Sequence, residues 1–183
     1  MAGYQFTLDQ LRVRSGDMPA ISGLITGPSG SPAGSGDLAL ATVGYVRSPI
    51  NAPSEAAVVL TADGFSYQYT APVRDPGMGN VYLRVFPKVV GLTAVLNGGI
   101  NDSVGTATFT VSAGALPERG WVVIDSEICA FVRTSATTGD ITRAQFGPAA
   151  AAHLSGAACT FAAGSVTCET AARLEVYEEK ITP

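Results

Sequence analysis

The sequence predicts an all-β protein, an antiparallel sandwich or open barrel followed by a second small β module. Its 183 residues include 21 glycines and 11 prolines, which divide the chain into short segments. These segments are rich in Val, Thr, Tyr and Phe, the residues that favour strands. No long run places apolar residues at the helical spacing i, i+3, i+4, i+7. Hydrophobic residues make up 46% of the chain, enough to build a folded core.

Residues 1–104 are expected to form an N-terminal β domain in which a turn recurs every ~8–12 residues. Its strands are predicted at 4–14, 38–46, 55–62, 65–71, 81–86 and 89–96. Asp63-Gly64 is a two-residue hairpin signal between two of these strands. Phe65, Tyr67 and Tyr69 then alternate with polar residues and share one strand face. We expect this face to lie in the core; the alternative is an exposed platform that stacks on a sugar or a partner.

The segment 27–36, GPSGSPAGSG, has the composition of a flexible loop. It is predicted to be either a solvated hairpin loop or an arm that becomes ordered against a neighbouring subunit. Together with the aromatic face, it supplies our candidate interface residues. These are Gly27, Pro28, Gly30, Pro32, Gly34, Phe65, Tyr67 and Tyr69.

Residues 105–163 are predicted to form the second β module, and residues 164–183 a C-terminal strand or tail. Strands are expected at 106–112, 121–125 and 127–133, the last two joined as a hairpin near Asp125-Ser126. Residues 170–180 are predicted to be either a last strand or a short helix.

Four polar residues of this module are interpreted as structural turn residues. Asp125 and Glu127 keep the hairpin tip soluble and can cap free N–H groups. Arg143 lies near a turn, where its planar guanidinium can bind a carboxylate or several carbonyls. His153 follows the small residues 149–152, which allow close backbone approach, and is expected to hydrogen-bond to the turn.

Composition excludes several classes of function. The net charge is −4 and no basic patch is visible along the sequence, so direct nucleic-acid binding is not expected. The chain has no signal-peptide pattern and no apolar stretch of the length that crosses a membrane. Charged residues are only 14%, against about 25% in typical proteins. A surface with so little charge suggests that partners cover much of it.

The sequence also argues against an enzyme, a metal site or a cofactor. His153 is the only histidine, and the chain has neither a nucleophile elbow nor a phosphate-binding loop. The three cysteines, Cys129, Cys159 and Cys168, match no zinc spacing and are expected to be reduced and buried. Asp125 and Glu127 could form a glycosidase-like pair, but acidic residues are common at hairpin tips. We therefore predict no catalytic activity and no cofactor.

Residues 106–161 resemble a small β module found in tailed-phage structural proteins. The family pattern has a Thr/Val strand, a hydrophobic strand ending in an acidic turn, then T-x-T-R-G and G-T-T-A-A-A-H. Here it reads TATFTVSAG, WVVIDSEICAFVRTSATTGDITRAQFG and PAAAAHLSGAACTF. The usual Gly after the Arg is Ala144, and the usual Thr-Thr is Pro148-Ala149. If that Gly serves a positive-φ turn, Ala144 is expected to adopt another conformation.

The resemblance implies a virion component, made in the host cytoplasm and assembled into the particle. The first hypothesis is a head decoration protein that binds the major capsid protein, with a homo-oligomer such as a trimer suited to the task. The second is a tail, baseplate or fibre-adaptor protein that binds other virion proteins. The third is a carbohydrate-binding receptor module that uses Tyr67, Tyr69 or Trp121.

Overall fold

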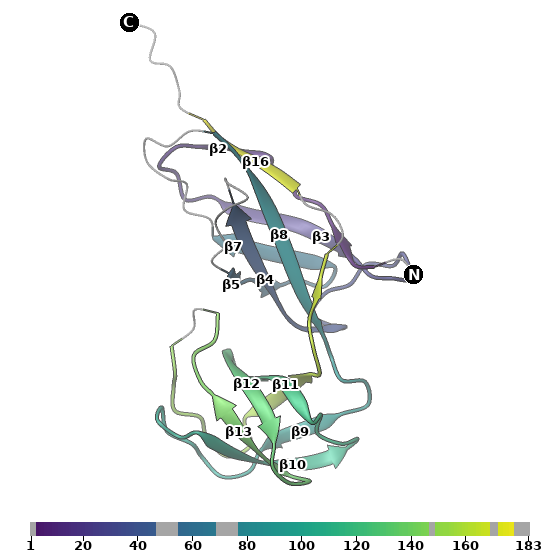
Figure 1. Cartoon of the computed structure of the whole chain (residues 1–183), viewed down its shortest axis with the longest axis vertical. Coiled ribbons are helices and arrows are strands. Elements are labelled where there is room, and N and C mark those ends of the chain that lie inside the picture. The colour runs from purple at the N-terminus through teal and green to yellow at the C-terminus, as the bar shows by residue number, and fades with distance from the viewer. Residues whose placement is uncertain (1–2, 47–54, 69–76, 147–148, 169–171, 178–183) are drawn as a thin grey trace, which may run out of the picture. The chain divides into compact units, whose positions relative to one another are not determined.

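The structure, a computed structural model, describes residues 3–46, 55–68, 77–146, 149–168 and 172–177 (Figure 1). Every regular element within these ranges is a β-strand, which confirms the predicted fold class. None of the described segments is a helix that could span a membrane. The chain divides into two compact units, each described separately below. We call residues 1–36, 41–85 and 166–183 the sandwich unit, and residues 37–40 and 86–165 the barrel unit.

The sandwich unit contains two sheets. The first has the strand order β1-β3-β7-β6, with β1 at Gln5–Phe6, β3 at Ala20–Thr26, β7 at Gly64–Gln68 and β6 at Val59–Leu60. The second has the order β2-β16-β8-β4-β5, with β2 at Arg12–Arg14, β16 at Ala172–Tyr177, β8 at Gly77–Pro87, β4 at Leu38–Val46 and β5 at Glu55–Ala57. A short strand, β15 at Val166–Thr167, also pairs with β8. Strands β2 and β16 are parallel, whereas β16 and β8 are antiparallel.

Burial alternates along these strands, as in two sheets that pack face to face. Phe65 is buried and its ring lies edge-on to Phe6, with the ring centroids 6.2 Å apart. The predicted core position of the aromatic face therefore holds for Phe65, while Tyr67 is half-buried. Tyr69 lies outside the described residues. The hairpin predicted at Asp63-Gly64 is present, because β6 and β7 pair there.

The segment 27–36 folds back on the sandwich unit. The Gly27 amide donates to the carbonyl of Ser31 at 2.8 Å, and the Ser35 amide donates to Thr61 at 2.7 Å. Gly34 is buried, and a Cβ at this position would clash with the carbonyls of Thr61 and Ala62. Within its own chain the segment thus forms a hairpin loop, and its ordering against a neighbouring subunit stays a prediction. Pro28, Gly30 and Pro32 are exposed on this loop.

The barrel unit is a closed six-stranded barrel with the order β10-β13-β12-β11-β14-β9. Its strands are β9 at Thr93–Leu96, β10 at Thr106–Ala113, β11 at Arg119–Ile124, β12 at Glu127–Arg133, β13 at Thr138–Thr142 and β14 at Ala158–Ala162. Phe109, Phe131 and Phe161 fill the interior, with ring centroids 5.1 to 5.8 Å apart. Closure pairs every strand of the barrel on both sides, so this unit has no sheet edge.

Two predicted boundaries are wrong. The second module was expected to begin at residue 105, but β9 pairs with both β10 and β14 and is needed to close the barrel. The main segment of the barrel unit therefore begins upstream, at Phe86. Residues 164–183 were expected to be a separate C-terminal strand or tail. Instead β16 inserts between β2 and β8 and belongs to the sandwich unit, which settles residues 172–177 as a strand.

Other expected strands are shorter than predicted. The segment 4–14 contains only β1 and β2, which belong to different sheets. The segment 55–62 is divided in the same way, with β5 next to β4 and β6 next to β7. Strand β3 was not predicted at all. In each case the chain passes from one sheet of the sandwich to the other within a few residues, which local alternation does not reveal.

Candidate functional site

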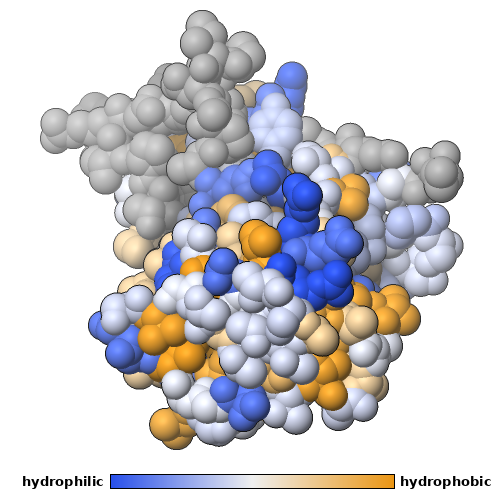
Figure 2. All heavy atoms as spheres, turned by 60° about the horizontal axis from the view of Figure 1, so that its bottom comes forward, coloured by the Kyte–Doolittle hydropathy of each residue, from blue (hydrophilic) through white to orange (hydrophobic). Residues whose placement is uncertain are grey.

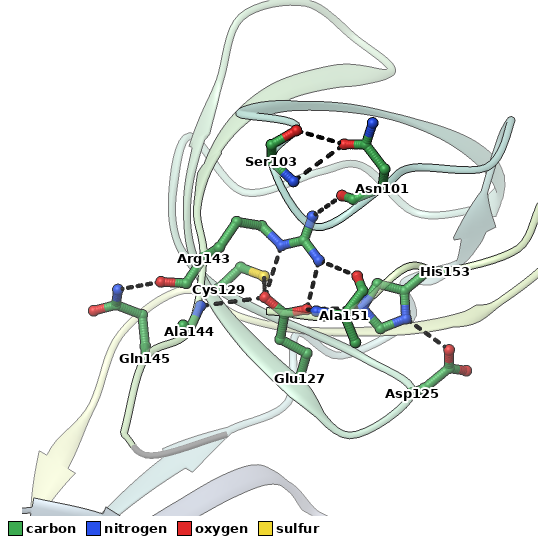
Figure 3. A network of polar contacts seen from close by, with 10 residues as sticks. All are labelled: Asn101, Ser103, Asp125, Glu127, Cys129, Arg143, Ala144, Gln145, Ala151 and His153. Carbon is green, nitrogen blue, oxygen red and sulfur yellow. Dashed lines mark hydrogen bonds and ion pairs between the residues drawn. The ribbon is translucent and has the colours of Figure 1, made fainter. Parts of the chain in front are cut away.

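The four turn residues singled out in the sequence meet in one polar network of the barrel unit (Figure 3). Asp125 lies in the turn between β11 and β12, and Glu127 begins β12. Arg143 follows the end of β13, and His153 precedes β14. We call these four residues the clamp. Residues up to 28 positions apart in the sequence are thus brought into hydrogen-bond contact.

Glu127 is the centre of the clamp and is only 2% exposed. Arg143 binds it with two N–H groups, Nε to Oε1 at 2.7 Å and Nη2 to Oε2 at 2.6 Å. The amides of Ala144 and Ala151 donate to the same carboxylate at 3.2 and 3.0 Å. His153 Nε2 lies 2.9 Å from Oε2. A buried carboxylate surrounded by donors in this way has its hydrogen-bonding capacity satisfied.

These contacts fix the charge of Glu127. Burial favours the neutral acid and so raises the pKa, but the hydrogen bonds from Arg143, Ala151, His153 and Ala144 outweigh it. The pKa of Glu127 is therefore held well below its ordinary value of 4.5. The group is a permanent carboxylate near neutral pH. It cannot act as a proton donor, as the acid of a glycosidase pair must.

Arg143 joins two further segments to the clamp. Its Nη1 donates to the carbonyl of Asn101 at 2.7 Å, and its Nη2 also donates to the carbonyl of Ala151. The guanidinium thus contacts a carboxylate and two carbonyls, the partners expected from its position near a turn. Asn101 is held in turn by an Asx-type contact, in which its Oδ1 accepts from the Ser103 amide at 3.1 Å.

His153 bridges the two carboxylates of the clamp. Its Nδ1 lies 2.8 Å from Oδ2 of Asp125, while Nε2 faces Glu127. Each ring nitrogen thus contacts one carboxylate, and the imidazole connects the two acidic residues. The backbone of His153 also exchanges two hydrogen bonds with Ile100, at 2.8 and 3.0 Å. The ring is buried, at 6% exposure, and holds the segment before β14 against the hairpin.

The structure corrects two details of the predicted turn. Glu127 was expected at a solvated hairpin tip, but it is enclosed and only Asp125 is exposed. Glu127 lies two and four residues before Cys129 and Phe131, on the same face of β12, and both of these residues are also buried. This alternation could have predicted that Glu127 is buried. Ala144 was expected to avoid a positive φ, yet its φ is 57°. It takes the left-handed conformation that the glycine of the related pattern would adopt more easily.

Other candidate residues lie in unreactive surroundings. The three cysteines are free and buried, as expected. Burial raises the pKa of Cys129, Cys159 and Cys168 to about 12, so their thiols stay protonated. Trp121 is half-buried, and its ring packs on Phe86 at 5.6 Å and on Phe146 at 5.0 Å. Within the described ranges, no three His, Cys, Asp or Glu side chains are grouped as metal ligands.

The clamp therefore connects the β11–β12 hairpin with the segments around Asn101, Ala144 and Ala151. Sequence reasoning named its four side chains but missed the backbone partners, because main-chain donors carry no residue-specific signal. In comparisons with known proteins, no family model, no curated protein and no solved structure matches the chain.

Proposed function

We propose that this chain is a structural component of a tailed-phage virion. Within the particle it acts as a head decoration protein that binds the outer surface of the capsid and stabilises the shell. The proposal starts from the resemblance of residues 106–161 to a module of phage structural proteins. It commits to a non-enzymatic role carried out through protein–protein contacts.

One observation carries the proposal: the side chains that mark the resemblance are all used to hold the barrel together. Glu127, Arg143 and His153 are buried and bonded to one another. Asp125, the exposed member, is bonded to His153. Polar side chains that bond mainly to one another stabilise the fold, and this arrangement supports a scaffold role for the motif. Scaffold modules of this kind suit particles built from many packed subunits.

The surface of the barrel unit supports contact with other proteins. Val90, Val132 and Leu154 are exposed to 96%, 55% and 83%. On the face shown in Figure 2, hydrophobic residues form several separate patches among weakly polar residues and groups of strongly hydrophilic ones. The chain as a whole has only 14% charged residues. Apolar patches on a surface with little charge are typical of proteins that pack against partners.

A decoration protein of this kind stabilises the shell by mass action. Because it binds assembled capsid and not free subunits, each occupied site adds RT ln(1 + [L]/Kd) to the stability of the assembled state. Sites of modest affinity, repeated over the whole shell, then produce a large total effect. A closed barrel and a sandwich with short edge strands also limit unwanted sheet-to-sheet association between free copies.

Copy number per purified particle tests the proposal, measured by quantitative mass spectrometry against the major capsid protein. A decoration protein is expected at roughly one copy per capsid subunit, as for a trimer that spans three subunits, or at roughly one per three if a single copy occupies each such site. The resemblance fits a tail, baseplate or fibre-adaptor protein as well. A total of a few to a few dozen copies would favour that second function and exclude decoration. Absence of the chain from purified particles would overturn both.

A further inference from the structure

The turn after β9 joins an asparagine directly to two glycines. Asn97, Gly98 and Gly99 are all exposed, and Gly98 has a φ of 84°. A Cβ added to Gly98 would meet no atom within 4 Å, so the space beside its Cα is open. The Asn97 backbone amide donates to the carbonyl of Thr108 at 2.8 Å. Among the described residues, none binds the side-chain amide of Asn97.

This arrangement places a nucleophile next to an electrophile. Hydroxide removes the proton of the Gly98 amide, and the nitrogen then forms a bond to Cγ of Asn97. The Cγ–Nδ2 bond breaks, and the departing nitrogen takes a proton from water and leaves as ammonia. Water then opens the succinimide ring at either of its two carbonyls. The product is an aspartate, or an isoaspartate in which the backbone runs through the former side chain.

The other asparagines that the structure describes are less suited to this reaction. Asn80 is half-buried within β8, a strand paired on both sides, and the β-branched Val81 follows it. Asn101 uses its Oδ1 to accept from the amide and the hydroxyl of Ser103, at 3.1 and 2.9 Å (Figure 3). Asn97 has an unbound side chain and a following residue without a Cβ, which leaves the attacking nitrogen unhindered.

One hydroxyl restrains the attacking nitrogen. Ser155, in the segment before β14, accepts the Gly98 N–H on its Oγ at 3.1 Å. Deprotonation leaves a lone pair along the former N–H bond, so this lone pair points at Ser155 and not at the Asn97 side chain. Ring closure therefore requires the hydrogen bond to break first. Because the bond is exposed, water replaces Ser155 at small cost, and the reaction is slowed without being prevented.

We propose that Asn97 is a site of spontaneous deamidation through a succinimide with Gly98, and that Ser155 restrains this reaction. Nothing in the chemistry depends on the proposed function. The isoaspartate product lengthens the backbone by a methylene shortly before Ile100, which exchanges two backbone hydrogen bonds with His153. The longer backbone shifts Ile100 against His153 and so loosens the clamp.

Incubation of the whole chain at mildly alkaline pH, followed by peptide mapping with mass spectrometry, tests the proposal. We expect aspartate and isoaspartate to accumulate at Asn97 while Asn80 and Asn101 stay intact. The rate should rise with pH, because hydroxide removes the amide proton. Asn97→Gln should stop the reaction at this position, since the longer side chain closes its ring far more slowly. An Asn97 that stays intact, or that reacts no faster than Asn80, would overturn the proposal.

The role of Ser155 is tested by removing its hydroxyl. Ser155→Ala is expected to speed deamidation of Asn97 about five-fold, because no hydrogen bond then holds the nitrogen. The matched control is Ser135→Ala, which removes a hydroxyl that accepts from the Thr137 and Thr138 amides in another turn of the barrel. The control should keep the wild-type rate at Asn97. An unchanged rate in Ser155→Ala, or an equal acceleration in Ser135→Ala, would contradict a restraint by Ser155.

Hydrogen exchange of fresh and aged protein measures the consequence for the clamp. The amides of Ile100 and His153 should exchange faster in the aged protein, in proportion to its isoaspartate content. Asn97→Asp supplies the charge without the added methylene and is expected to exchange both amides as fresh protein does. If aged protein keeps the protection of both amides, or if Asn97→Asp loses it equally, the lengthened backbone does not loosen the clamp.

Discussion

The two units of this chain hold their charged side chains in opposite ways. In the barrel unit, the pair Arg143–Glu127 has side-chain exposures of 9% and 2%. In the sandwich unit, the pair Arg12–Glu175 has exposures of 65% and 38%. The first pair is surrounded by further donors and acceptors, whereas the second lies in solvent beside a tyrosine ring. Similar residue types therefore serve internal cohesion in one unit and an external surface in the other.

The difference follows from how each unit is assembled from the sequence. The barrel uses a nearly continuous stretch, residues 86–165, and closes on itself. Its long loops must be fixed to the strands, and the clamp does this with a few strong, buried contacts. The sandwich is built from three separate segments, and its strand β2 pairs with β16 from the other end of the chain. Its cohesion comes mainly from apolar residues between two sheets.

The largest effect is expected from Glu127→Gln in the barrel unit. The substitution keeps the size of the side chain but leaves Arg143 buried without its counter-charge. Breaking a buried pair in this way costs about 3–5 kcal/mol of unfolding free energy. Hydrogen exchange followed by mass spectrometry should show faster exchange of the barrel amides.

Glu175→Gln is the matched control for this substitution in the sandwich unit. Because the Arg12–Glu175 pair is exposed, its loss is expected to cost less than about 1 kcal/mol. Equal destabilisation by the two variants would contradict the contrast between an internal clamp and an external surface.

The next effect is expected from Leu174→Ala in β16. Leu174 is fully buried, so the shortened side chain leaves a cavity that costs about 2–5 kcal/mol. Faster hydrogen exchange is expected in β8, β2 and β16, while the barrel amides keep their wild-type rates. If barrel exchange accelerates to the same degree, the two units unfold together and the comparison between them is lost.

Prediction from the sequence succeeded better for the barrel unit than for the sandwich unit. The hairpin of β11 and β12 was predicted because its strands are adjacent in the sequence and alternate clearly. The four clamp residues were found because they belong to a spaced pattern within one stretch of chain. In the sandwich, β3 was missed, and Gly23 in its middle weakens the strand signal. The pairing of β2 with β16 has no local signature, since β2 is only three residues long.

The placement of surface charge shows the limit most clearly. Along the sequence the arginines are scattered, and no basic patch is visible. The fold places Arg12 and Arg173 on adjacent strands of one sheet. Charge patterns that arise from long-range strand pairing need the register, which composition and periodicity do not supply. Burial of Glu127, by contrast, could have been inferred from its phase with Cys129 and Phe131.

A smaller loss of stability is expected on acidification. Protonation removes the charge of Glu127 while the shape of its side chain stays almost the same. The pKa of Glu127 is held below its ordinary value in the folded barrel, so as pH falls the unfolded chain takes up the proton first. The contribution of Glu127 to stability is therefore fully present above its ordinary pKa of 4.5 and is lost as pH falls towards the folded value. Between about pH 6 and about pH 3 the loss is on the order of 2 kcal/mol.

Denaturant unfolding of the wild type and of Glu127→Gln over this pH range measures that contribution. The variant should start less stable and lose less stability on acidification, so that the two curves converge at low pH. Parallel curves would show that other carboxyl groups, and not Glu127, cause the acid sensitivity of the barrel.

The smallest effect is expected from Ala144→Gly, and it addresses the resemblance directly. Ala144 has a φ of 57°, a conformation that costs an L-residue about 1–2 kcal/mol and glycine much less. Glycine also increases the conformational entropy of the unfolded chain, which offsets part of the stabilisation. We therefore expect stabilisation by roughly 0.5–1 kcal/mol, measured by denaturant unfolding.

Ala152→Gly is the control, because Ala152 is exposed and is not at a positive φ. Glycine there relieves no strain and only increases the conformational entropy of the unfolded chain, so we expect it to destabilise the barrel. Opposite signs for the two alanines would show that the left-handed turn after Arg143 is what the glycine of the related pattern provides. Destabilisation by both would mean that Ala144 stabilises the clamp by contacts that glycine cannot make, and that the barrel has adapted its turn to the alanine.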